Sequence, residues 1–331
     1  MHNNNRCGPR AGAWLSGIAL ALICAALATP AHAQDFPARR VRFLIGQPPG
    51  GGSDVLARLL GDKLAQLWRQ PFVVESLPGA SGSIAINAVI RAAPDGYTLG
   101  LLNFNNVVFE ALAKNPPYAL EKDVTPIISV ARQSNVLVLS PAVPANNVTE
   151  MLAYIRANPG KVSFASGGAG SPAHLAGELF KLQTGVDMVH IAYKGAGPAI
   201  QDVLAGNVTL MFAAAPAALP LVRAGKLRAL AVTSDTRSAQ TPEIPSLAES
   251  GIQFDVRDFQ GIVAPAGLAP ALLSRIHADL QQVLEMADVR ARIAQLGGET
   301  TGGTPAAFAG QIRSEAAKWK RVVREAKLSA E

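Results

Sequence analysis

Three glycine-rich stretches of the sequence have the residue types and positions of anion-binding loops. They lie at 50–54, 79–83 and 166–171, and each follows a short apolar run and precedes a segment with helical spacing. Glycine tolerates positive φ angles and lets a ligand approach the backbone closely. The first turn of a helix carries N–H groups without helical acceptors and a partial positive charge. Such loops could hold an anion without a lysine or an arginine.

The same residues also suit a purely structural role. Ser53, Asp54, Ser83 and Ser171 are of the types that cap helices, and glycine is common in tight turns. Asp54 has the wrong charge for contact with an anion, so we expect it to cap the helix or brace the loop. One loop alone does not separate the two interpretations. Three loops in two halves of the chain favour a shared anion-binding cleft.

Polar residues beside these loops leave further alternatives open. His174 lies in the first turn after the third loop, where packing or capping is favoured over ligand contact. Lys194 follows Tyr193 before another predicted helix, and it could meet a carboxylate or remain solvated. The run Asn103–Asn106 could supply polar contacts at the end of a strand or form a turn.

Motifs for other chemistries are absent from the sequence. It contains no GxxxxGK[ST] loop, no GxGxxG after the first apolar run and no GxSxG elbow. His174, His190 and His277 do not have zinc-ligand spacing, so no metal or other cofactor is expected. A hydrolase that used Ser53 or Ser171 with His174 would need a triad pattern that the sequence lacks. We therefore expect a binding protein and no enzyme.

Repeated strand–loop–helix patterns predict the elements that position the loops. In the first part, strands are predicted at Val41–Gly46, Phe72–Glu75 and Thr98–Leu102, with helices at Asp54–Trp68 and Ile84–Ala93. This βαβαβ order predicts a parallel sheet covered by helices.

The α/β pattern resumes later in the chain and ends in helices. Later strands are predicted at 136–139, 162–165, 189–192, 208–212 and 228–233, and helices at 148–158, 173–184, 198–205, 216–224, 270–286, 288–296 and 304–327. Segments near 133–139 and 257–267 would cross between two parts of the molecule. We therefore predict two α/β lobes, the first formed by 34–135 plus 260–331 and the second by 136–259.

The first 33 residues have the features of a cleaved export signal. Arg6 and Arg10 precede the apolar stretch Ala11–Ala28, and an A-x-A pattern ends at Ala33. We expect cleavage after Ala33 and location in a bacterial periplasm. No later segment is apolar enough over a sufficient length to span a bilayer.

Cysteine usage and amino-acid composition further limit the class of protein to which the chain can belong. Cys7 and Cys24 both lie in the predicted leader, so the mature chain would have no disulfide. Cys24 could instead carry a lipid, but the bulky Ile23 before it argues against this. The chain is 49% hydrophobic and 16% charged, which indicates a globular protein. Its net charge of +6 is scattered and aromatics are only 5%, which argues against a nucleic-acid partner.

Several motifs, taken in order, resemble one known family. They are FLIGQPPGGGSDVLAR, VVESLPGASGSIA, AAPDGYTLGLL, SGGAGSPAHLAGELFK, HIAYKGAGPAIQDVLAGNVTLMF, GKLRALAVTS, IPSLAESG and FQGIVAPAGLAP. The predicted mature chain resembles the Bug-type receptors, the extracytoplasmic solute-binding proteins of tripartite tricarboxylate transporters. The resemblance implies an α/β type II periplasmic-binding fold that captures a small mono- or dicarboxylate between two lobes. It also implies a monomer with inner-membrane permease subunits as partners; the alternative is a periplasmic sensor that presents its ligand to a signalling partner.

The resemblance also implies which residues contact the ligand. From the first lobe they are Pro49, Gly50, Gly51, Gly52, Ser53, Asp54, Gly79, Ala80, Ser81 and Gly82. Asn103 is a further candidate contact, in a stretch that is particular to this chain and departs from the family pattern. From the second lobe they are Ser166, Gly168, Ala169, Gly170, Ser171, His174, Tyr193, Lys194, Gly195 and Ala213.

Two departures from the family pattern bear on the ligand. Ala213 stands where family members often have an aspartate, which removes an acceptor for a ligand ammonium group. Phe259, Gln260 and Gly261 stand where an aromatic-aromatic-glycine triplet is common. The first departure argues against amino acids such as aspartate as ligands. The sequence does not name the carboxylate.

Overall fold

The computed structural model describes residues 36–328, and the elements below belong to one compact unit that begins at Arg39. The predicted leader and its cleavage site lie outside the described residues. None of the helices in residues 36–328 has the length and apolar character needed to cross a bilayer.

The first lobe begins with the predicted βαβαβ unit. Strand β1 (Val41–Ile45) pairs in parallel with β2 (Phe72–Ser76) on one side and β3 (Thr98–Asn103) on the other. Helix α2 (Gly52–Trp68) connects β1 to β2, and α3 (Ser83–Ile90) connects β2 to β3. The prediction of a parallel sheet is confirmed, although α2 begins two residues earlier than predicted.

Helix α4 (Phe104–Leu112) directly follows β3 and was not predicted from the sequence. Its start is stabilised by the Asn103 backbone N–H, which donates to the Oδ1 atom of Asn106 at 2.9 Å. Phe104 is fully buried and meets Trp319 edge to face, with 5.2 Å between ring centroids. The run of asparagines therefore begins a helix that is anchored by tertiary packing. The short helix α5 (Leu120–Asp123) comes next in the chain.

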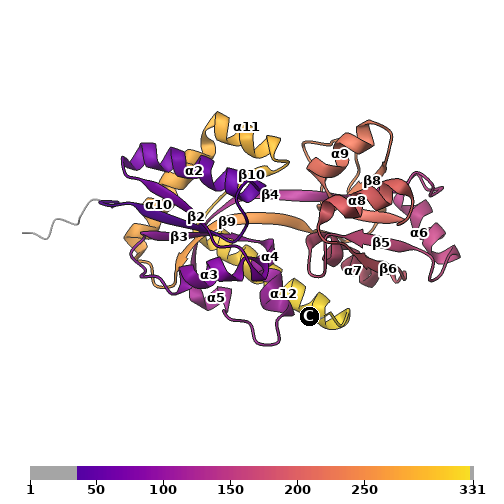
Figure 1. Ribbon diagram of the computed structural model, residues 1–331, viewed down its shortest axis with the longest axis horizontal. Helices are drawn as coiled ribbons and strands as arrows, with labels where there is room; N and C mark the ends of the chain where they lie inside the picture. Colours follow the sequence, from indigo (N-terminus) through magenta and orange to yellow (C-terminus); the bar gives the residue numbers. More distant parts are fainter. Residues whose placement is uncertain (1–35, 329–331) are drawn as a thin grey trace, which may run out of the picture. The chain divides into compact units, whose positions relative to one another are not determined.

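Two long strands connect the lobes (Figure 1). Strand β4 (Val124–Leu139) pairs antiparallel with β9 (Arg257–Pro265) from Val124 to Ser134, and β9 also pairs with β3. From Asn135 onward, β4 pairs instead with strands of the second lobe. The resulting sheet has the order β2-β1-β3-β9-β4-β7-β5-β6. The predicted crossing segments correspond to β4 and β9, whereas the exact lobe boundaries remain a prediction.

The second lobe repeats the α/β design. Its strands are β5 (Ser163–Ser166), β6 (Val189–Ala192), β7 (Leu210–Ala214) and β8 (Arg228–Val232), and its helices are α6 (Val148–Ala157), α7 (Pro172–Thr184), α8 (Ala196–Ala205) and α9 (Ala215–Arg223). Strand β5 pairs in parallel with both β6 and β7. The helices predicted here are all present, within two residues at their starts.

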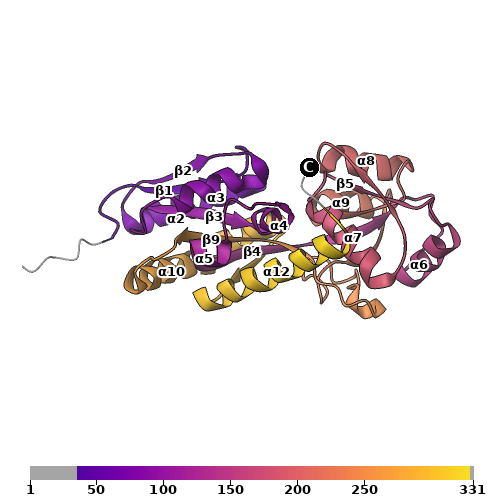
Figure 2. The same cartoon turned by 90° about the horizontal axis from the view of Figure 1, so that it is seen from below.

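The C-terminal part returns to the first lobe. It comprises α10 (Pro270–Glu285), α11 (Ala287–Gln295), the unpredicted strand β10 (Glu299–Gly302) and α12 (Pro305–Glu325). The Trp68 indole N–H of α2 donates to Asp279 of α10 at 2.7 Å. Figure 2 shows α12 running along β4, where Trp319 is completely buried.

Candidate functional site

The first glycine loop opens α2 with its backbone donors unpaired. Gly51 is the N-cap with extended backbone, and no side chain caps this end. In the described part of the chain, the first-turn N–H groups of Gly52 and Ser53 therefore have no protein acceptor. Asp54 braces the loop as expected, because its Oδ2 atom accepts from the Gly50 N–H and from Arg58 Nε, each at 3.0 Å. These two bonds lower the pKa of Asp54, that from Arg58 most strongly.

The second loop has an unusual backbone. Gly79, Ala80, Ser81 and Gly82 all have positive φ, at 124°, 43°, 55° and 84°. A residue with a Cβ atom is rarely found in this region, and such strain concentrates at functional sites. The Gly82 N–H donates back to the Gly79 carbonyl at 2.8 Å, and Ala80–Gly82 form a single 3₁₀ turn. Gly79, Ala80 and Ser81 are exposed.

The first two loops are fixed against each other. Gly46, at the end of β1, lies so close to Gly82 that a Cβ atom added there would be 2.9 Å from the Gly82 carbonyl oxygen. The Ser76 hydroxyl donates to the Gln47 carbonyl at 2.5 Å. The Asn106 amide donates to the Ser81 carbonyl at 3.3 Å. The two loops therefore act as one preorganised backbone surface.

Two stacked histidines, His174 and His190, contact the third glycine loop and hold it in place. Ser166 is completely buried, and its Oγ lies 2.7 Å from His190 Nε2. The His174 Nδ1 atom accepts from the Gly170 N–H at 3.0 Å, and the two imidazole rings stack with centroids 3.9 Å apart. Burial, followed by the neighbouring His190, lowers the pKa of His174 to about 4. His174 thus packs beneath the loop, in agreement with the interpretation favoured from its position.

The remaining second-lobe residues that were predicted to contact the ligand lie in separate environments. The Tyr193 hydroxyl donates to Asp202 at 2.5 Å, and this hydrogen bond raises the pKa of Tyr193 to about 12. Gly195 donates its N–H to the Gly167 carbonyl, which ties its loop to the third glycine loop. Lys194 is exposed. Ala213 is completely buried in β7.

A hollow of about 180 Å³ lies where the first lobe, the crossing strands and the start of α7 meet. We call it the cleft hollow. It is lined by Gln47, Ser53, Asn103, Phe104, Asn105, Gln133, Pro172, Asp258, Phe259 and Gln260. Among these residues there is no lysine or arginine, so a bound anion would depend on backbone and amide donors.

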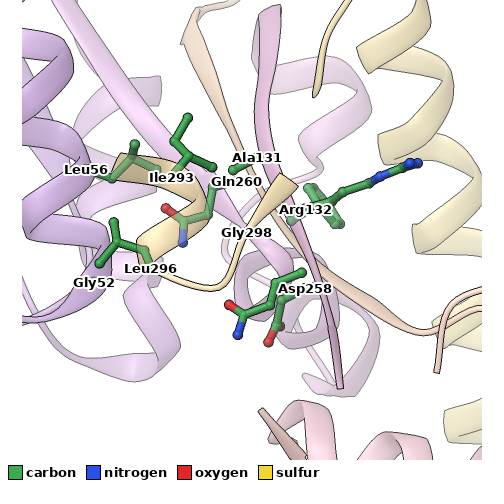
Figure 3. A pocket seen from close by; sticks show the side chains of 11 residues that line it. Gly52, Leu56, Ala131, Arg132, Asp258, Gln260, Ile293, Leu296 and Gly298 are labelled. Carbon is green, nitrogen blue, oxygen red and sulfur yellow. The ribbon is translucent and has the colours of Figure 1, made fainter. Parts of the chain in front are cut away.

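A smaller hollow of about 80 Å³ adjoins it beneath the start of α2 (Figure 3). It shares Gln133, Asp258, Phe259 and Gln260 with the cleft hollow and adds an apolar group, namely Leu56, Ala131, Ile293 and Leu296. In this view the Asp258 carboxylate lies at the opposite end of the lining from Leu56 and Ile293, and the Arg132 side chain extends away from the hollow.

Strand register places the polar lining residues on one face of the sheet. Gln260 of β9 lies directly opposite Asn103 of β3 and Ala131 of β4. Asp258, two residues before Gln260, lies opposite Gln133. Because alternate strand residues share a face, these side chains all project from the same side of the sheet.

The structure brings only some of the predicted residues to the cleft hollow. Ser53 and Asn103 line it, and Gly52 lines the adjoining hollow. The second and third glycine loops, Tyr193, Lys194, Gly195 and Ala213 line neither, so ligand contact by them stays a prediction. Sequence reasoning missed Asp258 and Gln133; the available signal was polar residues in the two segments predicted to cross between lobes.

Comparisons with known proteins identify the family. A family model described as the tripartite tricarboxylate transporter family receptor, TctC, matches residues 56–328. The chain belongs to this family. Protein BugT of Bordetella pertussis is 36% identical over 314 residues, which cover 94% of this chain and 96% of BugT.

Solved structures agree with this assignment. An R. palustris protein solved with adipate has a TM-score of 0.75 at 30% identity and covers 89% of this chain and 99% of that one. MatC from Rhodopseudomonas palustris, solved with bound malate, has a TM-score of 0.71 at 28% identity and covers 87% and 100%. The Bug-type resemblance and the two-lobed α/β periplasmic-binding fold are thereby confirmed. Within residues 36–328, no group of histidines, cysteines and acids is arranged to hold a metal ion.

Proposed function

We propose that the chain is a periplasmic receptor that captures a small carboxylate for a tripartite tricarboxylate-type uptake system. The observation that carries this proposal is the uncapped start of α2 beside the cleft hollow, with unpaired N–H groups at Gly52 and Ser53. Backbone donors at a helix start favour a carboxylate even where no cationic side chain is present.

The dimensions and the relatives support a small ligand. The cleft hollow of about 180 Å³ is below the roughly 300–1,000 Å³ of pockets for drug-sized ligands. Adipate and malate, found with two similar proteins, are carboxylates of few carbon atoms. Binding would draw the lobes together about β4 and β9, and the closed form would be presented to inner-membrane permease subunits.

A matched pair of substitutions at Gly52 tests the role of the backbone donors. Gly52 is the first residue of α2 and has open space around it. Gly52→Pro removes the N–H at a position where proline fits a helix, whereas Gly52→Ala keeps it. A hydrogen bond to a charged group contributes about 1.5–3 kcal/mol, so proline should lower carboxylate affinity by about tenfold or more.

Isothermal titration of the wild type and both variants against a carboxylate panel gives the measurement. We expect binding of at least one mono- or dicarboxylate, with the alanine variant within about threefold of the wild type. Binding of uncharged sugars with no carboxylate bound would refute the proposal. Equal affinity of the proline variant would show that the Gly52 N–H does not hold the ligand.

A further inference from the structure

A row of four polar side chains on β3, β9 and β4, here called the polar row, is not explained by packing within the chain. It consists of Asn103, Gln260, Asp258 and Gln133, which strand register places on one face of the sheet. All four line the cleft hollow, whereas the aromatic Phe259 between them packs against Phe104 and Phe308. Asn103 is buried and the other three are half-buried, so four polar side chains gather where a sheet face would normally carry apolar ones.

These side chains lack partners within the described residues. Asn103 is 94% buried, and its amide nitrogen is without a hydrogen bond. The Oε1 atom of Gln260 is also buried and unpaired. The Asp258 side chain is half-buried at the edge of the cleft hollow, and within residues 36–328 its carboxylate has no hydrogen bond or ion pair. Leaving such groups unpaired is unfavourable, which is why native proteins do so rarely outside functional sites.

The chemistry of the row favours a ligand group that donates hydrogen bonds. An ionised carboxylate only accepts, and amide oxygens accept as well. Two arginines of these strands, Arg132 and Arg257, alternate to the other face, where Arg132 donates to Glu299 at 3.2 Å and Arg257 to Asp255 at 2.6 Å. Burial without a compensating cation raises the pKa of Asp258 to about 7. A second ligand carboxylate placed beside Asp258 would meet a like charge, and no lysine or arginine lines the cleft hollow to offset it.

We propose that Asp258, Gln260 and Asn103 form a second subsite that accepts hydrogen bonds from a hydroxyl or ammonium group carried by the bound carboxylate. The ligand is then a hydroxy- or amino-substituted carboxylate. This inference rests on the proposed function, since the α2 start holds the carboxylate itself. It also revises the argument against amino acids, because Asp258 supplies the acceptor that Ala213 lacks.

Matched ligand series test the subsite. Isothermal titration at pH 7.5 would compare propionate, lactate and alanine; succinate, malate and aspartate; and glutarate, 2-hydroxyglutarate and glutamate. Within the series that binds, we expect a substituted member to bind at least tenfold more tightly than the plain acid. Asp258→Ala should remove that advantage, so that the substituted acid and the plain acid bind with affinities within about threefold of each other.

The outcomes separate the inference from the proposed function. Plain acids that bind as tightly as their substituted counterparts, or an equal loss for both in Asp258→Ala, would overturn the subsite and leave the receptor proposal intact. Binding of no carboxylate in any series would overturn both. Asp258→Asn distinguishes the two donors: it should weaken an amino acid by about 100-fold, because the charge is lost, and a hydroxy acid by less than about tenfold.

Stability of the free protein supplies a second readout. If Asp258 served only the structure, its replacement would make the protein less stable. We expect the opposite for Asp258→Asn, with a melting temperature at pH 8 raised by a few degrees, because desolvation makes a charged carboxylate unfavourable at this position. Asp187→Asn is the control for net charge, since its side chain is 80% exposed, and should change neither affinity nor melting temperature. A lowered melting temperature together with unchanged ligand selectivity in Asp258→Asn would contradict the inference.

Discussion

Replacing Gly46 with alanine should separate the first two glycine loops of the first lobe. Gly46 is buried at the end of β1, and its neighbour Gly82 belongs to the second loop. An added Cβ atom would lie 2.9 Å from the Gly82 carbonyl oxygen, 3.1 Å from its carbonyl carbon and closer still to its Cα atom. These are all backbone atoms, so no side-chain rotation can relieve the overlap. Gly46 does not have a positive φ, and the effect is therefore purely steric.

The size of the effect follows from these distances. Carbon atoms in contact lie about 3.5–4.0 Å apart, so the loops must separate by about 1 Å. Overpacking of this kind costs about 1–3 kcal/mol of stability. A hydrogen bond with a donor–acceptor distance of about 2.9 Å is broken when that distance grows by about 1 Å. Loss of one bond to a carboxylate, worth about 1.5–3 kcal/mol, lowers affinity by between about tenfold and 100-fold.

Titration of the carboxylate bound by the wild type, combined with urea unfolding, measures both quantities. Gly197→Ala is the control, because Gly197 lies in helix α8 with no atom within 4 Å of an added Cβ. Alanine is the better helix former, so this control should be neutral or slightly stabilising. Wild-type affinity and stability in Gly46→Ala would refute the view that this close approach positions the loops.

Two further predictions concern the second lobe. Because the pKa of His174 is lowered to about 4 by burial and by His190, the unfolded chain takes up this proton first as the pH falls below 6.5. This contribution to the free energy of unfolding is fully present above pH 6.5 and decreases toward pH 4, by on the order of 2 kcal/mol. His174→Asn keeps an acceptor for the Gly170 N–H, and urea unfolding should show a smaller loss of stability between pH 6.5 and pH 4 in this variant than in the wild type. Equal losses in the two proteins would contradict this prediction. In Gly177→Ala, the new Cβ would lie 2.5 Å and 2.7 Å from two ring atoms of the fully buried Phe164 and closer still to a third. We expect a loss of about 1–3 kcal/mol in thermal unfolding, and an unchanged melting temperature would show that the ring can move aside.

Local patterns in the sequence were sufficient for the parallel parts of the fold. The runs at Val41–Ile45 and Thr98–Asn103 are short and apolar, and glycine or proline punctuates the helices between them. By contrast, the first half of β4 contains Pro126 at a point where its register with β9 shifts. Proline in a strand normally argues against a strand, and only a bulge of this kind accommodates it. The first half of β4 could therefore not be predicted from the sequence, because Pro126 fits in a strand only where the pairing with β9 forms a bulge.

The polar row illustrates the same limit at the site. Asn103 and Gln260 are 157 positions apart in the sequence and become neighbours only through the antiparallel register of β3 and β9. Helix α4 was missed for a related reason, since Phe104 is fixed by Trp319 from the last helix. Glycine loops can be recognised from the local composition of the sequence, whereas the polar row is assembled from three strands and has no local sequence pattern.

The exchange of partners along β4 has a mechanical consequence. Gln133 and Asp258 are cross-strand neighbours next to the point where β4 leaves β9 for β7 and β8. Any flexing of one lobe against the other bends the chain beside these two side chains. The proposed selectivity subsite and the bending point of β4 thus coincide. A substitution there that changes which solute binds should therefore also change the rate at which the lobes close. Homologues with different solutes should accordingly differ in closing rates as well as in affinities.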